Sequence, residues 1–593
     1  MKHSTTININ KQHLHKKESY EILFNNNLSE EHCSVKIPYL PMIKVSNISA
    51  SIVSPNGKLI KKLNKSDISS KSLTNNYSFY TDNMLKEFTL KHDAYPYILK
   101  YSYETDESEF MLIDCWKPYF DYKIPVANAE LDVSVPSDYP IKYISRFVPE
   151  PETDTTSNTV SYHWKMYNTQ PAYNEEFSPN IDDLQSSVTI FPVNFHYGNP
   201  GSFDSWASFG NWQYKTNKER QTLDEAEIKR IGQITNGITD SIQLLKTLYH
   251  DLQDNMRYVN ISIKTGRYVT YPAQYVVENR FGDCKALSNY FQSVLNLYGF
   301  RSHYSLVNAS DDIPWINEAI SCPQFNHIIL CVPVQRDTIW LDCTSKGPFG
   351  YLGTFTQGRK ALIVEKNKSR LVGTPALTPG QVLNQRSIRF ENLSENTCKT
   401  IVSKTLRGDN FEFLAHIHSD LSTKKMEYYV RKKMVEPDFE PDSIKVHAIN
   451  RDSLSIGLSY VAATNNLLYK YGGNRVLKPI RITVPKLENP SYRHSDLQIN
   501  YPIYQTDEQF FGLGNEFKTG KIPAPQSVDC QFGSYQTSWQ QVPGGIIFKQ
   551  LLLLKATHIP IDKSMALYRE LYDFIEKIHE IENQNNILLT NNN

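Results

Sequence analysis

The feature that most constrains the fold is a change of residue pattern along the chain, from strand-like to helix-like and back. Residues 20–195 form short runs rich in β-branched and aromatic residues, separated by turn residues such as Pro55-Asn56-Gly57. Helical periodicity begins after Gly201, and short strand-like runs return from Arg370 onward. The pattern predicts a central α+β region between two β regions.

Three domains account for this pattern in a chain of 593 residues, a length that favours roughly three to five domains. We expect an N-terminal antiparallel β-sandwich-like domain over residues 1–200 and an α+β core over residues 201–370. Residues 371–593 are expected to form a second β-sandwich-like domain, which ends in an amphipathic helix at 565–581. The predicted fold class is therefore α+β and multidomain.

The central region contains the most strongly periodic helix of the chain. Between Cys284 and Phe300 apolar residues form one wide stripe, and Gly299 stands where a helix C-terminus favours glycine. Upstream, Thr222 followed by Glu225 fits a capping box, so we expect a helix to begin there. Three strand-like runs follow the long helix, at 301–307, 327–334 and 338–342.

Charge and composition argue against several classes of function. The chain carries 63 Lys+Arg and 63 Asp+Glu, and it has no long basic run. Because binding to nucleic acid or to an anionic membrane surface depends on such charge, neither partner is expected. No apolar stretch approaches the roughly 20 residues of a membrane span. With eight cysteines and no CxxC pair, we expect no disulfide scaffold, no metal site and no cofactor.

Cys284 is the strongest candidate for a chemically active residue. It stands at the start of the long helix, where unpaired backbone N–H groups and the helix dipole stabilise a thiolate. His327 begins one strand-like run, and Asp342 ends the next. If these two strands form an antiparallel hairpin, the two side chains meet. In that arrangement Asp342 orients His327, and His327 pairs with Cys284.

These residues carry a resemblance to the bacterial transglutaminase-like core of the papain-like cysteine peptidase superfamily. The matching motifs are Phe281-Gly-Asp-Cys284-Lys, Phe325-Asn-His327 and Trp340-Leu-Asp342-Cys-Thr-Ser. The flanking regions are similar to β domains of the DUF3857 type before the core and of the DUF3858 type after it. The resemblance implies that Cys284 attacks a carboxamide or peptide carbonyl, with His327 acting as general base and then as general acid.

Three functions remain open at this point. If water releases the acyl-enzyme, the protein is a thiol peptidase or amidase, which the resemblance favours. If an amine releases it, the protein is a protein-glutamine transglutaminase. The third alternative is a non-catalytic binding or scaffold protein with a degenerate core. An enzyme would take a peptide or protein substrate, and the β domains are candidates for binding a cell-surface polymer or protein.

The resemblance also implies a location. Relatives with these flanking domains are mostly exported, so the periplasm or the cell surface of a Gram-negative bacterium is expected. The first residues, Met1-Lys2-His3-Ser4-Thr5-Thr6, contain no apolar signal segment. A cytoplasmic location therefore stays open.

The oxyanion donor differs from the papain-like pattern. In that pattern a glutamine lies a few residues before the nucleophile, but here Glu278 occupies the corresponding position. The backbone N–H of Cys284 is the expected donor. Tyr258 and Gln274 are the side-chain candidates for a second donor.

Two further features are open. Cys343 follows Asp342 where the resembled family usually has proline, so it is either a packed thiol or a disulfide partner of Cys331. The loop over residues 311–323 is a candidate lid over the cleft.

Overall fold

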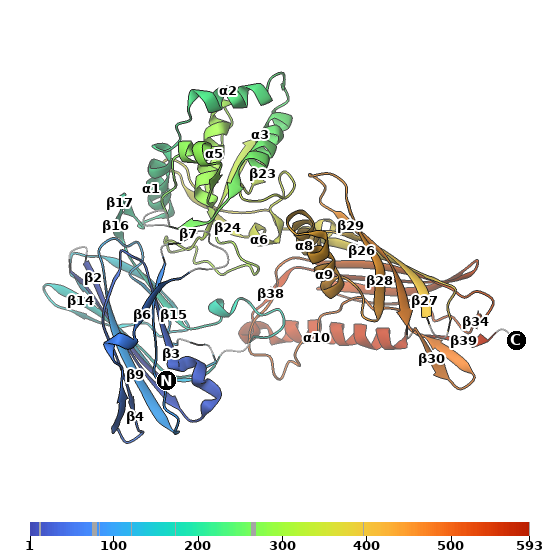
Figure 1. The fold of residues 1–593 in the computed structure, drawn as a ribbon, viewed down its shortest axis with the longest axis horizontal. Helices are drawn as coiled ribbons and strands as arrows, with labels where there is room; N and C mark the ends of the chain where they lie inside the picture. Colours follow the sequence, from blue (N-terminus) through green and yellow to red (C-terminus); the bar gives the residue numbers. More distant parts are fainter. Residues whose placement is uncertain are drawn as a thin grey trace.

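The chain folds into three units, each built on its own sheet (Figure 1). The computed structural model describes residues 1–10, 13–73, 80–81, 83–119, 121, 123–171, 174–262, 268–394, 397–465 and 467–591. An N-terminal β unit, a central α/β unit and a C-terminal unit of strands and helices follow one another along the chain. The prediction of a mixed, multidomain α/β protein is confirmed.

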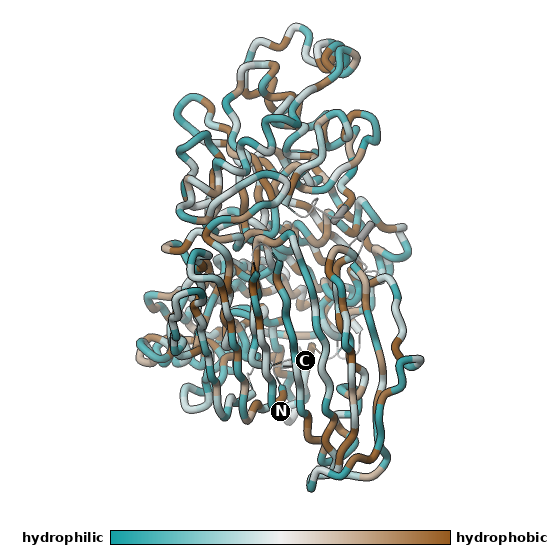
Figure 2. The backbone as a smooth tube through the Cα atoms, turned by 90° about the vertical axis from the view of Figure 1, so that its left-hand side faces the viewer, coloured by the Kyte–Doolittle hydropathy of each residue, from teal (hydrophilic) through white to brown (hydrophobic). Residues whose placement is uncertain are grey.

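The N-terminal unit is centred on an eight-stranded sheet. Across the sheet its strands are β13 (Glu152–Thr155), β14 (Thr159–Thr169), β11 (Val126–Pro136), β1 (Lys2–Asn10), β2 (His13–Phe24), β9 (Tyr97–Glu107), β4 (Lys44–Val53) and β5 (Leu59–Lys62). Polar and apolar residues alternate along these strands (Figure 2), which leaves one apolar face. Two three-stranded sheets pack on that face: β10 (Asp114–Trp116), β15 (Ser187–Pro192) and β12 (Ile141–Arg146), and β3 (Ser34–Tyr39), β8 (Met84–Thr89) and β6 (Ser69–Ser72).

The expectation of a purely antiparallel N-terminal sheet is wrong at one pair. β1 and β11 run parallel, with Ile7 opposite Val133. Parallel neighbours need a long connection, and more than half of this unit lies between the two strands. Short-range strand patterns contain no information about such a pairing.

The central unit is a five-stranded antiparallel sheet with helices packed against one face. Its strands are, in order, β23 (Asp337–Leu341), β22 (His327–Val334), β21 (His303–Val307), β24 (Lys360–Ile363) and β25 (Arg370–Gly373). The helices are α1 (Trp206–Lys218), α2 (Glu225–Ile234), α3 (Ser241–Asn255), α4 (Ala273–Asn279) and α5 (Cys284–Leu297). The predicted long helix and the three strands after it are confirmed.

Aspartates cap three of these helices, α2, α3 and α5. Asp283 precedes α5, and its carboxylate accepts a hydrogen bond from the backbone N–H of Ala286 at 2.8 Å. α2 is capped by Asp224, which accepts from the N–H of Glu227 at 2.7 Å. The predicted capping box at Thr222 is therefore wrong, because the helix begins later in the chain and an aspartate serves as its cap.

The C-terminal unit also contains an eight-stranded sheet. In order its strands are β28 (Phe439–Ala448), β29 (Ile456–Asn465), β27 (Thr397–Leu406), β26 (Leu383–Glu391), β33 (Ile503–Gly512), β37 (Gly545–Leu554), β36 (Gly533–Val542) and β35 (Gln526–Cys530). The helices α8 (Gly408–Asp420), α9 (Thr423–Lys433) and α10 (Ile561–Gln584), with a small four-stranded sheet, cover its apolar face. This differs from the expected β-sandwich, because helices take the place of a second sheet of comparable size.

The predicted amphipathic helix near the C-terminus is α10, which extends beyond 565–581 at both ends. Its apolar residues, among them Leu571, Phe574 and Ile578, are buried against the sheet. Among the described residues, no helix combines the length and the apolar character needed to span a membrane.

A buried ion cluster lies inside the C-terminal unit. The carboxylate of Glu436 is 2.6 Å from the Lys404 ammonium and 3.1 Å from the Arg386 guanidinium. Tyr460 donates a hydrogen bond to the same carboxylate, and Asp507 lies 2.7 Å from Arg386. These side chains are largely buried, so each charge depends on the others for compensation.

Candidate active site

Cys284, His327 and Asp342 come together at one end of the central sheet. β22 and β23 form the predicted hairpin, with Leu330 opposite Leu341, so His327 and Asp342 lie at the same end of the pair. Nε2 of His327 is 2.9 Å from Oδ2 of Asp342. Cys284 is one of the groups that raise the pKa of His327, so its thiol lies close to the imidazole. All three side chains belong to buried residues, which makes their mutual interactions strong.

A close approach of two chain segments positions Cys284. β20 (Phe281–Gly282) runs directly into α5 and pairs in parallel with β18 (Arg257–Tyr258), which places Tyr258 opposite Gly282. A Cβ atom at Gly282 would lie 2.9 Å from the Cβ of Ala286, closer than real Cβ atoms pack. The glycine therefore allows the strand to turn tightly into the helix that presents the thiol.

The environment of His327 favours its protonated form. Burial lowers the pKa of His327, but the charge and hydrogen bond of Asp342, together with the contact to Cys284, outweigh burial and raise it to about 10. Because Asp342 occupies Nε2, Nδ1 is the ring nitrogen left for the thiol. The geometry therefore suits a thiolate–imidazolium pair.

Asp342 is held in a fixed orientation by its neighbours. Its Oδ1 accepts hydrogen bonds from the Thr344 backbone N–H at 2.9 Å and from Oγ1 of Thr344 at 2.7 Å. Tyr249 donates to the backbone carbonyl of Asp342 at 2.9 Å. Burial raises the pKa of Asp342, but the charge of His327 and these hydrogen bonds outweigh it and lower that pKa, so the carboxylate stays ionised.

Sequence reasoning missed Thr344 and Tyr249 as supports of Asp342. Thr344 stands in the same motif as the aspartate, and a threonine two residues after a carboxylate is a common turn partner, so a signal existed. Tyr249 lies far upstream in α3, and nothing in the sequence connects it with Asp342. Phe355, whose ring lies edge-on to the His327 ring at 6.4 Å between centroids, was missed for the same reason.

Lys285 is a buried neighbour of the thiol rather than a solvated surface lysine. Its ammonium is 2.5 Å from Oδ2 of Asp283. Burial lowers the pKa of Lys285, but the charges of Cys284 and Asp283 outweigh it and raise that pKa. Lys285 therefore remains a cation beside Cys284, where positive charge stabilises a thiolate.

The structure separates the two side-chain candidates for the oxyanion donor. The Gln274 amide donates to Asp224, the N-cap of α2, at 2.8 Å and to Glu278 of α4 at 3.3 Å. Both of its N–H groups are therefore engaged. Gln274 is thus not directed at Cys284. Tyr258 adjoins the cysteine through the β18–β20 pair, and burial and the charge of Cys284 raise its pKa, which keeps the phenol O–H as a donor.

Cys343 is a packed thiol. It lies in the core between the sheet and the helices, whereas Cys331 packs with Trp340 on the opposite face of the sheet. A disulfide between Cys331 and Cys343 is therefore sterically excluded, and every cysteine of the described chain is free. Among the described residues, no group of three or more His, Cys, Asp and Glu side chains is arranged to hold a metal ion.

The loop over residues 311–323 is tied to both flanking units. Ile313 N–H donates to Oδ1 of Asn500 at 3.0 Å, and Trp315 N–H donates to Oδ2 of Asp183 at 3.0 Å. Trp206 of α1 donates to the carbonyl of Glu318 at 2.8 Å. In this structure the loop joins the three units and does not form a free lid.

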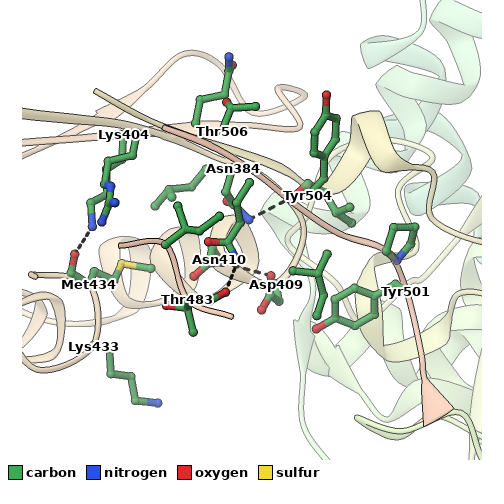
Figure 3. Close-up of a pocket in the computed structure, with 18 of the residues that line it drawn as sticks. Asn384, Lys404, Asp409, Asn410, Lys433, Met434, Thr483, Tyr501, Tyr504 and Thr506 are labelled. Carbon is green, nitrogen blue, oxygen red and sulfur yellow. Dashed lines mark hydrogen bonds between the residues drawn. The ribbon is translucent and has the colours of Figure 1, made fainter. Parts of the chain in front are cut away.

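A cavity of about 700 Å³ in the C-terminal unit is separate from this site (Figure 3). Asp409 and Tyr501 lie at one end, and Lys404 and Lys433 lie at the other. Lys404 donates to the carbonyl of Met434 at 2.5 Å and pairs with the buried carboxylate described above. The residues that line the cavity do not include Cys284, His327 or Asp342, so it is not the candidate active site.

Family comparisons identify the two flanking regions. Residues 11–173 match the DUF3857 family and residues 473–589 match the DUF3858 family, each described as a domain of unknown function with a solved structure. Segments on either side of the α/β unit therefore match the two families that the sequence resembled.

The fold is shared with the crystal structure of a putative protease from Parabacteroides distasonis ATCC 8503, with a TM-score of 0.64 and 12% identity over 100% of this chain and 98% of that chain. A putative cysteine protease from Cytophaga hutchinsonii matches with a TM-score of 0.16 and 10% identity, over 56% of this chain and 75% of that chain. The first likeness establishes the fold alone, and the second is too low to support an argument. Comparison with curated proteins gives no match.

Proposed function

We propose that the protein is a thiol-dependent hydrolase, a peptidase or amidase, in which Cys284, His327 and Asp342 carry out the reaction. The single observation that supports this most is the buried His327–Asp342 pair at 2.9 Å, with the second nitrogen of the imidazole left for a cysteine at a helix N-terminus. A scaffold protein has no need for a buried charged pair of this kind. The fold shared with a putative protease agrees with hydrolysis.

The first half of the reaction forms an acyl-enzyme. The Cys284 thiolate attacks the carbonyl carbon of an amide, so a C–S bond forms and the carbonyl oxygen becomes an oxyanion. The backbone N–H of Cys284 and the hydroxyl of Tyr258 donate to this oxygen. His327 then transfers its proton to the leaving nitrogen, and the C–N bond breaks to release an amine and leave a thioester.

The second half returns the enzyme to its starting state. His327, now neutral, accepts a proton from water as the water oxygen attacks the thioester carbonyl. The C–S bond breaks, a carboxylic acid leaves, and the proton on His327 restores the ion pair with Cys284. Asp342 keeps the imidazole in one orientation throughout both halves. An amine in place of water would give transglutaminase chemistry at the same residues, which is the alternative outcome.

The proposal is tested by incubating the protein with fluorescein-labelled casein and with a mixture of glutamine peptides and a labelled primary amine. Hydrolysis predicts release of labelled fragments that depends on Cys284. Incorporation of the amine without fragment release would favour the transglutaminase. Both enzyme proposals would be contradicted if the protein acted on neither kind of substrate and alkylation of the Cys284 thiol were no faster than that of an ordinary cysteine.

Asp342→Asn is expected to lower kcat/KM by roughly a thousand- to ten-thousand-fold, because the amide stabilises neither the imidazolium nor the correct tautomer of His327. The unfolding midpoint should also fall, because buried His327 loses its charged partner, so the activities are compared at a temperature at which both proteins are folded. Asp337→Asn, at the exposed opposite end of β23, is the matched control and should retain full activity. Retention of activity in Asp342→Asn would show that His327 works without this carboxylate.

A further inference from the structure

The three units meet around a cavity of about 1440 Å³. Arg146 and Phe147 of the N-terminal unit, Trp315 and Gln357 of the central unit, and Gln498 of the C-terminal unit are among its lining residues. The volume exceeds the several hundred Å³ typical of a small-molecule pocket, so the cavity is large enough for a segment of a polymer.

An aromatic platform forms one wall of this cavity. The Arg146 guanidinium lies 4.3 Å from the centroid of the Trp315 ring and 5.7 Å from that of Phe147. Asp183 fixes the guanidinium through a contact of 2.6 Å. Trp315 is 45% exposed and Phe147 is 66% exposed, and Phe147 has a left-handed backbone with φ of 51°. Two large exposed aromatic rings, one on a strained backbone, are typical of a binding surface rather than of a core.

The amide side chains of the cavity are already engaged. Asn500 accepts from Ile313 N–H at 3.0 Å and donates to Asp312 at 3.0 Å. Gln498 donates to the Ile313 carbonyl at 2.8 Å and to Asn500 at 2.7 Å, and Gln357 donates to the Asn500 carbonyl at 3.2 Å. A saccharide would need such groups for its hydroxyls, so their internal use favours an apolar ligand.

Most of the charged side chains around the cavity have a partner of opposite sign. Lys360 pairs with Glu318 at 2.9 Å, His558 lies 3.3 Å from Asp496, and Arg146 has its partner in Asp183. Of the remaining charged residues of the lining, Arg359 is buried, and Asp562 and Lys563 are adjacent and opposite in sign. A strongly charged ligand therefore gains little from these walls, and a neutral, largely apolar chain fits them better.

The lining of this cavity does not include Cys284, His327 or Asp342, but the cavity reaches the end of the central sheet at which those residues lie. Val307 of β21 lies opposite both His327 and Ala361, and Lys360, which lines the cavity, directly precedes Ala361. From Val307 the chain reaches Trp315 in eight residues, which span at most about 30 Å when fully extended. A bound polypeptide of about the same number of residues can therefore connect the platform with the end of β21 that lies opposite His327.

We infer that this cavity is the cleft for an extended, largely apolar segment of a polypeptide substrate, with Trp315 and Phe147 as its recognition platform. The inference rests on the proposed hydrolase function and names its substrate class: proteins and long peptides, which reach from Cys284 to the platform. Short amides and peptides of a few residues contact only the residues around the thiol.

The first test compares two peptides with the same cleavable bond, one of about four residues and one extended by about ten apolar residues. Trp315→Ala should lower the ratio of kcat/KM for the long peptide to that for the short peptide about tenfold, through the KM of the long peptide. Tyr428→Ala removes an exposed ring on α9 and should leave this ratio as in the wild type. An unchanged ratio in Trp315→Ala would overturn the inference.

The second test does not depend on catalysis. The long peptide, carrying a fluorophore, is titrated with Cys284→Ala and with Cys284→Ala/Trp315→Ala, and its anisotropy is followed. Binding that weakens about tenfold in the double variant supports the cleft even if the wild type cleaves nothing, in which case only the hydrolase proposal fails. Equal binding by the two variants overturns the cleft alone. Trp315-dependent binding of a neutral oligosaccharide in place of the peptide also overturns it.

Discussion

Cys284→Ala is expected to lower kcat/KM for peptide hydrolysis by about ten-thousand-fold or more, with little change in the unfolding midpoint. Its sulfur is the only protein atom that bonds to the carbonyl carbon in the proposed reaction, and no neighbouring group replaces it. The small size of the substitution keeps α5 and its cap at Asp283 intact. Hydrolysis of labelled casein and thermal unfolding followed by circular dichroism measure the two effects.

Cys331→Ala provides the matched control, since this buried thiol lies four residues along β22 from His327, about 13 Å away in an extended strand, and belongs to a different core cluster from Cys284. It should keep its activity, with a modest loss of stability from the smaller side chain. If Cys284→Ala retained a tenth or more of wild-type activity, Cys284 would not be the nucleophile. A large loss of stability in Cys284→Ala would instead indicate a structural role for the thiol.

Glu436→Ala is expected to lower the free energy of unfolding of the C-terminal unit by about 3–5 kcal/mol. The substitution removes the shared partner of Lys404 and Arg386 and leaves their charges buried. It also leaves the Tyr460 hydroxyl without its acceptor. Urea unfolding, followed by the fluorescence of the C-terminal tryptophan Trp539, measures the loss.

Glu440→Ala is the control for this prediction, because Glu440 is an exposed glutamate on β28 and lies close to Glu436 along the chain. A surface substitution of this kind changes stability by about 0.5 kcal/mol or less. Equal midpoints for Glu436→Ala and Glu440→Ala would contradict the prediction, because they would mean that Lys404 and Arg386 do not depend on Glu436 for compensation.

The candidate catalytic residues could be found from the sequence because each has a local signal. A cysteine at the start of a strongly amphipathic helix is visible in the residue pattern, and so are a histidine and an aspartate at the ends of successive strands. Short turns make a hairpin the simplest connection, which fixes the end of the sheet at which His327 and Asp342 meet. The structure places these residues as this reasoning expects.

The features that sequence reasoning missed depend on contacts between distant segments. Gln274 was a candidate oxyanion donor because it lies close to Cys284 along the chain. In the structure its side-chain amide instead donates a hydrogen bond to the Asp224 carboxylate and accepts one from the Asp224 backbone N–H. Contacts between distant segments also produce the parallel pairing of β1 with β11 and the packing of helices on the C-terminal sheet. The platform of Trp315 and Phe147, with Arg146 beside both rings, combines side chains of the central and N-terminal units. No local sequence pattern indicates it.

The pH dependence of iodoacetamide alkylation at Cys284, compared in the wild type and in His327→Ala, tests the proposed ion pair most directly. His327 has a pKa raised to about 10, so its imidazolium and the stabilisation it gives persist below that pH and are lost as the pH rises through it. Mass spectrometry of the peptide that contains Cys284 gives the rate at each pH.

In the wild type we expect rapid alkylation well below the reference thiol pKa of about 8.5, because the imidazolium holds the thiolate. In His327→Ala the rate should rise only near that reference value. Slow alkylation that rises near the reference value in both proteins, with no effect of the substitution, would contradict an activated Cys284–His327 pair and with it the proposed hydrolase.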